Sequence, residues 1–344
     1  MFNKLQRNKR SLCLDVKAPG GQALLHRLVA ESDVVVNNYS PRGVQSLGID
    51  HDSLSAVNPK IITVSMSGYG ATGPMATHSS FGPVLETHAG LASTTGYPDR
   101  GPLRIGVAFP DPLGGLSGTI AILGALWERQ VTGLGSAVDL SQLETLLPVI
   151  GDHLLTTSVT GELPPRLGNR SAAYAPQGVY RSGGEDNWLA ITVRSDDEWD
   201  RLVDLLGDEL LAAAEYRTVA GRHEHHDAID ERLTAWTSSI GRFEAMGALQ
   251  ARGVPAMVVL TNADMVDGPQ LQARGFIAMI ESNDAGPQRL PGSPLHFSDL
   301  EIPLGPAPTL GQHNEDIAGG LLGYDSAELA QLVADGALAT SPPT

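Results

Sequence analysis

The order of short apolar segments in the first third of the chain constrains the fold most. Four apolar residues recur at the spacing of one helix face, namely Leu24, Leu25, Leu28 and Val29. Runs of β-branched residues, typical of buried strands, follow at 33–37 and 60–64. Helical and strand patterns that alternate in this way predict an α/β fold with a parallel sheet and right-handed crossovers.

Turn-forming and polar residues follow both predicted strands. They are Asn-Asn-Tyr-Ser-Pro at 37–41 and Ser-Met-Ser-Gly-Tyr-Gly at 65–70. Parallel sheets bind ligands outside the carboxyl ends of their strands. We therefore expect the functional site at these two segments.

The rest of the chain predicts a second, smaller α+β module. Two long apolar helices are expected at 113–131 and 138–156, and a Pro/Gly-rich linker or mobile loop at 161–184. The module then consists of strands at 188–193 and 255–260 and of helices from 196, near 227–239 and at 242–251, and the tail that follows it ends in a helix around 326–337. The predicted domains are a large α/β domain at 1–184, a small domain at 185–288 and a returning C-terminal segment at 289–344.

Charge and composition exclude several classes of partner. The 344 residues carry 39 acidic and 23 basic side chains, a formal net charge of −16. This field repels nucleic acid and anionic membranes, so an anionic ligand needs a local basic pocket. Cys13 is the single cysteine, which excludes an internal disulfide, and its apolar neighbours favour a core position. No segment approaches the ~20 apolar residues of a membrane span, and no signal peptide is recognisable, so we expect a cytoplasmic protein.

Asp111 has an unusual setting between two prolines at the start of an apolar helix. With Pro112 in the first helical position, Asp111 would be the N-cap residue. A capping carboxylate is fixed in space, and a nucleophile also has to be fixed, so both roles are compatible. Nearby Gly114, Gly115 and Gly118 would let a ligand or a neighbouring element approach the backbone.

An ordered set of segments along the whole chain resembles the class III CoA-transferases, also called the CaiB/BaiF family. The matching segments are 8–17, 38–41, 47–48, 67–74, the stretch around Asp111, 175–180, 253–256, 267–271 and 310–313. The resemblance implies a Rossmann-like large domain with a parallel sheet, a smaller α+β domain and an interlocked homodimer.

The resemblance also implies covalent chemistry at Asp111. In this family the aspartate attacks an acyl-CoA, forms a mixed anhydride and then an aspartyl-CoA thioester, and passes CoA to a second carboxylic acid. Coenzyme A is thus a substrate, and no metal is required. The oxyanion donors are expected in the loop at Gly168 and Asn169, where the family carries a glycine-rich lid.

Five further residues are carried over from the family as CoA contacts. They are Leu14, Lys17, Asn38, Tyr39 and Ser40. Lys17 would meet a phosphate and Tyr39 would stack near the adenine. The alternatives are a solvated lysine and a tyrosine buried at the end of a strand.

Two departures from the family leave alternatives open. The usual N-terminal strand-helix-strand unit is absent from this sequence, which implies a misassigned start, a partner subunit that supplies the unit, or a truncated, non-catalytic remnant. The related α-methylacyl-CoA racemases need a histidine base where this chain has Phe81, so transfer is favoured over epimerisation. His88 is out of register with that base and is expected to be structural.

A histidine-rich segment at 223–226 could suggest a metal site. Its spacing supplies no third ligand, and an amphipathic helix starts at Asp227. We therefore expect a solvated helix start and no bound metal.

Overall fold

The computed structural model describes residues 2–282 and 285–341. By their contacts, these residues form two compact units, each built from separate stretches of sequence. The first unit comprises Met1–Ala89, Gly106–Gly151 and Val266–Thr344, and the second comprises Gly90–Ile105 and Asp152–Met265. The predicted domain bounds stay a prediction.

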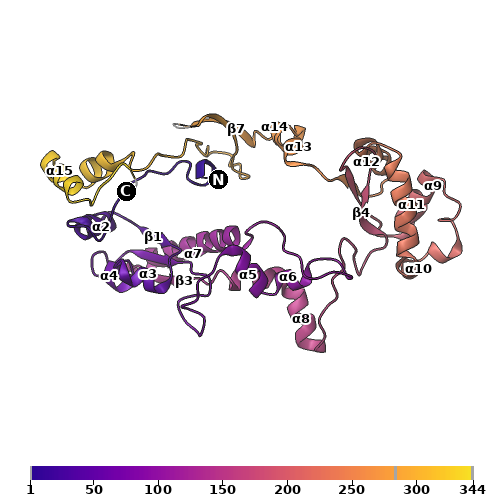
Figure 1. The fold of residues 1–344 in the computed structure, drawn as a ribbon, viewed down its shortest axis with the longest axis horizontal. Coiled ribbons are helices and arrows are strands. Elements are labelled where there is room, and N and C mark those ends of the chain that lie inside the picture. Colours follow the sequence, from indigo (N-terminus) through magenta and orange to yellow (C-terminus); the bar gives the residue numbers. More distant parts are fainter. Residues whose placement is uncertain (1, 283–284, 342–344) are drawn as a thin grey trace. The chain divides into compact units, whose positions relative to one another are not determined.

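The first unit contains a parallel three-stranded sheet (Figure 1). Its strands, in spatial order, are β1 (Val34–Asn37), β2 (Ile62–Ser65) and β3 (Ala137–Asp139). In register, Val64 of β2 pairs with Val36 on one side and with Val138 on the other. Ile62 and Val64 are fully buried, as expected for β-branched residues in a covered parallel sheet. The predicted α/β fold with a parallel sheet is confirmed.

Helices connect the strands of this sheet. Between β1 and β2 lie α3 (Pro41–Ser46) and α4 (His51–Ser55), and between β2 and β3 the first unit contributes α5 (Gly82–His88) and α7 (Pro110–Thr132). Its other elements are α1 (Phe2–Leu5), α2 (Gly21–Ala30), the 3₁₀ helix η1 (Glu144–Ile150), α14 (Pro269–Ala273), the antiparallel strands β7 (Ile277–Ser282) and β8 (Gly286–Pro291), the π-helical η3 (Glu315–Leu321) and α15 (Ser326–Ala334).

The helix predicted at 113–131 is confirmed as the central part of α7. Pro110 starts the helix in a position where its missing N–H costs nothing. Gly133 ends it in the left-handed region at φ 75°, which glycine adopts without strain. Ala125 packs against the buried side chains of β2, so α7 covers one face of the sheet.

The prediction of one continuous helix at 138–156 is wrong. β3 takes the first two residues of that segment, the 3₁₀ helix η1 begins only at Glu144, and α8 (Gly151–Thr160) covers the end. The backbone N–H of Gln142 donates to the carbonyl oxygen of Ser67 at 3.0 Å, so the segment after β3 still runs beside the end of β2. Pro148 lies inside η1, where its ring and its missing N–H oppose a regular α-helix.

The second unit is an antiparallel sheet packed with helices (Figure 1). Its strands, in spatial order, are β4 (Gln177–Arg181), β5 (Trp188–Thr192) and β6 (Ala256–Val258). Its helices are α6 (Leu91–Thr94), α9 (Asp196–Leu206), the 3₁₀ helix η2 (Ala214–Tyr216), α10 (Val219–Glu224), α11 (His226–Ser238), α12 (Arg242–Ala251) and α13 (Asn262–Val266). Buried Ile191, Trp199, Leu233 and Leu249 join β5, α9, α11 and α12 in one core. The predicted α+β module is confirmed.

Candidate functional site

A cavity of about 540 Å³ lies at the carboxyl ends of the parallel strands in the first unit. Asn38 and Ser40, which follow β1, contribute to its wall. Ser67 and Tyr69 follow β2, and Gln142 follows β3. The cavity is therefore where the sequence predicts a ligand to bind in a parallel sheet.

Asp111 also lines this cavity, from the first turn of α7. Phe109 is the N-cap residue of the helix, and Pro110 takes the first helical position. The amide N–H of Asp111 donates to the carbonyl oxygen of Ala108 at 3.2 Å, so the chain turns before it reaches Pro112. The prediction that Asp111 is the N-cap is wrong, because Pro110 and not Pro112 starts the helix.

The carboxyl group of Asp111 lies against a glycine. A Cβ atom on Gly82 would lie 2.8 Å from Oδ2 of Asp111 and 2.8 Å from the Cβ of Ala108. The side chain of Asp111 still reaches solvent, yet partial burial raises the pKa of its carboxyl group above the ordinary 3.8. A carboxylate with less water around it is more basic, which favours nucleophilic attack.

Gln142 joins two backbone groups at the end of β2. Its side-chain Nε2 donates to the carbonyl oxygen of Met66 at 2.9 Å, and its backbone N–H donates to that of Ser67 at 3.0 Å. Helix α7 approaches closely, since a Cβ on Gly114 would lie 3.2 Å from Cγ of Gln142 and one on Gly118 would lie 2.6 Å from Sδ of Met66. The two glycines thus allow a neighbouring segment to touch the helix backbone.

The predicted CoA contacts after β1 divide between two cavities. Asn38 and Ser40 line the cavity of Asp111, whereas Tyr39 lines a neighbouring cavity of about 260 Å³. Tyr39 is 53% exposed and so is not a buried strand-end residue. The hydroxyl of Ser40 accepts a hydrogen bond from the N–H of Gly43 at 3.2 Å and caps α3. Their contacts with CoA stay a prediction.

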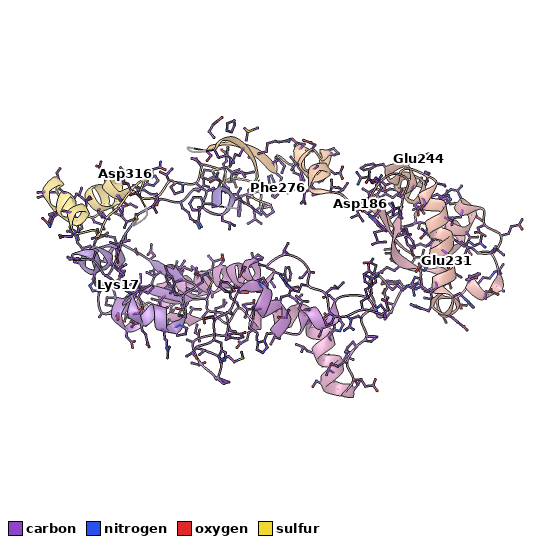
Figure 2. All side chains as sticks on the ribbon, viewed as in Figure 1. Lys17, Asp186, Glu231, Glu244, Phe276 and Asp316 are labelled. Atoms are coloured by element: carbon purple, nitrogen blue, oxygen red, sulfur yellow. The ribbon has the colours of Figure 1, made fainter. Side chains whose placement is uncertain are left out.

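The other two predicted CoA contacts lie elsewhere in the first unit. Leu14 forms an isolated antiparallel bridge with Leu338 and packs against the core around Leu24. Lys17 is exposed in the segment before α2, where its N–H donates to Oδ1 of Asp15 at 2.8 Å (Figure 2). Within the described ranges, neither residue lines the cavity of Asp111. Their role in CoA binding also stays a prediction.

Phe81 occupies the position where a racemase would need its histidine base. It is the N-cap residue of α5, lines the cavity and is 76% exposed. Its ring has no group that accepts a proton, which argues against epimerisation. Nδ1 of His88 lies 3.1 Å from the hydroxyl of Tyr69, in an edge-on contact between the rings. This contact supports the structural role expected for His88.

The histidine-rich segment differs from the expected solvated helix start. α11 begins at His226, which is only 3% exposed, and its Nε2 accepts the N–H of Gln177 at 3.3 Å. Within residues 2–282 and 285–341, no group of three or more His, Cys, Asp and Glu side chains is arranged to hold a metal ion.

No helix in these ranges is long and apolar enough to cross a bilayer.

The predicted lid residues belong to the second unit. The N–H of Gly168 donates to the carbonyl oxygen of Gly96 at 2.9 Å. The side-chain amide of Asn169 donates to the hydroxyl of Tyr97 at 3.3 Å. These contacts hold Gly168 and Asn169 in place locally. That this loop supplies the oxyanion donors stays a prediction.

The known proteins that resemble this chain in sequence or structure belong to one family. Residues 1–314 match CoA-transferase family III. The succinyl-CoA–D-citramalate CoA-transferase of Chloroflexus aurantiacus is 33% identical over 96% of this chain and 82% of its own length. The succinate–glutarate CoA-transferase of Agrobacterium fabrum is 31% identical over 92% of this chain and 79% of its own length.

A solved structure extends the match to three dimensions. The CaiB/BaiF family protein of Brucella suis is 33% identical and superposes with a TM-score of 0.86 over 93% of this chain and 83% of its own. Sequence and fold therefore agree over nearly the whole chain. The chain belongs to CoA-transferase family III.

Proposed function

We propose that this enzyme transfers coenzyme A from an acyl-CoA to a free carboxylic acid through a covalent intermediate on Asp111. The observation that supports this most is the setting of the Asp111 carboxylate. It lies in the first turn of α7, faces a cavity at the strand ends, and has a pKa raised by partial burial. Family membership supplies the reaction class, and this side chain supplies a nucleophile suited to it.

The reaction would proceed in four balanced steps. The Asp111 carboxylate attacks the thioester carbonyl, which gives a mixed anhydride and CoA thiolate. The thiolate attacks the aspartyl carbonyl, which releases the first acid and leaves aspartyl-CoA. The second carboxylate attacks aspartyl-CoA to form a new anhydride, and the released thiolate attacks its acyl carbonyl. Overall, one thioester is exchanged for another of similar energy, so no ATP is consumed.

The named relatives suggest dicarboxylic acids as substrates. Their names specify succinyl-CoA with citramalate, succinate with glutarate, and formyl-CoA with oxalate. We propose succinyl-CoA as the first donor to test and a dicarboxylate as the acceptor. A cytoplasmic location remains part of this proposal.

A second copy of the chain would complete the enzyme. Five residues lie along one side of α7 and are between 63% and 81% exposed: Leu116, Ile120, Leu123, Trp127 and Val131. Their spacing of three or four residues makes one apolar helix face, which marks an interaction surface. The family resemblance implies a homodimer, and we propose that the second copy covers this face. Light scattering on the purified protein distinguishes a dimer from a monomer.

The covalent intermediate can be tested by mass spectrometry. After incubation with succinyl-CoA, we expect a CoA adduct on the peptide that contains Asp111. Asp111→Asn should form no adduct and should fold at least as stably at pH 7, because the raised pKa means that ionised Asp111 destabilises the fold above the ordinary pKa of 3.8. Asp52→Asn, on the exposed surface of α4, is the matched control. Wild-type protein that forms no adduct with succinyl-, acetyl- or formyl-CoA would refute the covalent route.

A further inference from the structure

Ser67 carries a buried hydroxyl group that has no assigned role. The residue is 7% exposed and follows β2 by two positions. Among residues 2–282 and 285–341, its Oγ has no hydrogen-bond partner. Buried hydroxyl groups are nearly always paired, because an unpaired one loses its bonds to water without replacement. The unpaired hydroxyl of Ser67 therefore destabilises the folded chain.

The backbone around this hydroxyl is firmly held. The carbonyl oxygen of Ser67 accepts the backbone N–H of Gln142 at 3.0 Å, and that of Met66 accepts the side-chain amide of the same residue at 2.9 Å. Gly68, the next residue, is packed so tightly that a Cβ there would lie 1.7 Å from Oγ of Ser80. The hydroxyl of Ser67 is therefore preorganised, since the segment that carries it has little freedom to move.

Ser67 and Asp111 line the same cavity. The packing also joins them through the segment before α5: Ser80 contacts Gly68, and Gly82, two residues later, contacts the carboxyl group of Asp111. A substrate that reaches the carboxylate therefore enters a cavity whose wall includes Ser67. Ser67 also lines the smaller cavity that contains Tyr39, so a ligand there is the competing explanation.

We propose that Ser67 is a second catalytic residue, whose hydroxyl donates a hydrogen bond to the acyl oxygen as that oxygen becomes an oxyanion. The proposal rests on the covalent transfer at Asp111. When the carboxylate attacks, the carbonyl oxygen gains a full negative charge, and a fixed donor stabilises this charge more than it stabilises the ground state. The proton stays on Ser67, and no bond to its oxygen forms or breaks.

The test compares two buried serines. Ser67→Ala should lower kcat for transfer from succinyl-CoA to glutarate on the order of 10²-fold, with both KM values within about twofold of wild type. It should melt at the same temperature as wild type or higher, because it removes an unpaired group. Ser182 is 1% exposed, and its hydroxyl donates to the carbonyl oxygen of Ile240 at 2.9 Å. Ser182→Ala should therefore melt lower and keep kcat.

Three outcomes would overturn the proposal. If Ser67→Ala melts lower and keeps kcat, the hydroxyl is structural. If it changes a KM and keeps kcat, the hydroxyl binds a ground-state ligand, as an occupant of the smaller cavity would require. If it keeps both kcat and KM, the hydroxyl has no part in the reaction. Failure of the covalent route itself is recognised separately, because wild-type protein would then carry no adduct on Asp111.

Discussion

Gly82→Ala is the substitution that most directly tests the surroundings of Asp111. The new Cβ would lie 2.8 Å from Oδ2 of Asp111 and 2.8 Å from Cβ of Ala108, whereas ordinary contacts of a Cβ begin near 3.4 Å. Both contacts are too short by about 0.6 Å, so both must be relieved. We expect the carboxyl group to rotate away, and the backbone of Gly82 or Ala108 to shift because the Cβ of Ala108 cannot move without it.

Two losses of different size follow from this crowding. Overpacking costs roughly 1–3 kcal/mol of folding free energy. A misplacement of about 1 Å costs on the order of 10²-fold in rate, so a shift of about 0.6 Å should slow adduct formation at Asp111 roughly tenfold or more. Urea unfolding measures the first quantity, and time-resolved mass spectrometry with succinyl-CoA measures the second.

Gly247→Ala is the matched control for Gly82→Ala. Gly247 lies in α12 of the second unit, where an added Cβ has no described atom within 4 Å. The same change should therefore stabilise the protein by about 0.5–1 kcal/mol, the usual gain when glycine inside a helix becomes alanine, and leave the rate unchanged. A Gly82→Ala protein with the stability and adduct rate of wild type would refute the inferred packing of Gly82 against Asp111.

The second unit allows two further predictions. Arg222→Ala should cost about 1.5–3 kcal/mol in urea unfolding, because this fully buried guanidinium donates to the carbonyl oxygen of Ala175 at 2.6 Å and to Oδ1 of the more exposed Asp196 at 2.8 Å; a loss below about 1 kcal/mol would contradict its structural role. Burial lowers the pKa of His226 below the ordinary 6.5, so the unfolded chain binds a proton more readily and stability should fall as the pH drops below 6.5. His226→Gln should reduce this slope in thermal melts across pH 5–8, and an unchanged slope would assign it to other groups.

The parallel sheet could be predicted from the sequence because its strands are β-branched runs with turn residues after them. β1 and β2 fall within one or two residues of the predicted 33–37 and 60–64. The carboxyl-end rule then places Asn38 and Ser67 near the ligand without any knowledge of side-chain packing. Both residues do line the cavity of Asp111.

Gln142 could not be found in the same way. It falls in the segment 138–156, whose apolar residues fit helical spacing as well as a short strand, and periodicity alone does not separate the two. The deciding contacts are long-range: the N–H of Gln142 donates to Ser67, far away in the sequence. The burial of His226 was missed for the same reason, since its partner Gln177 belongs to another element.

The start of α7 brings together the two interpretations of Asp111, as cap and as nucleophile. Because Phe109 is the N-cap residue, the carboxylate of Asp111 is not the capping group and remains available to a substrate. The positive end of a helix dipole still favours its negative charge, typically by about 0.3–1 kcal/mol. Partial burial acts in the opposite direction and raises the pKa. The first turn of α7 therefore fixes the carboxylate in place while the cavity limits its solvation, which is the combination that a covalent carrier of CoA requires.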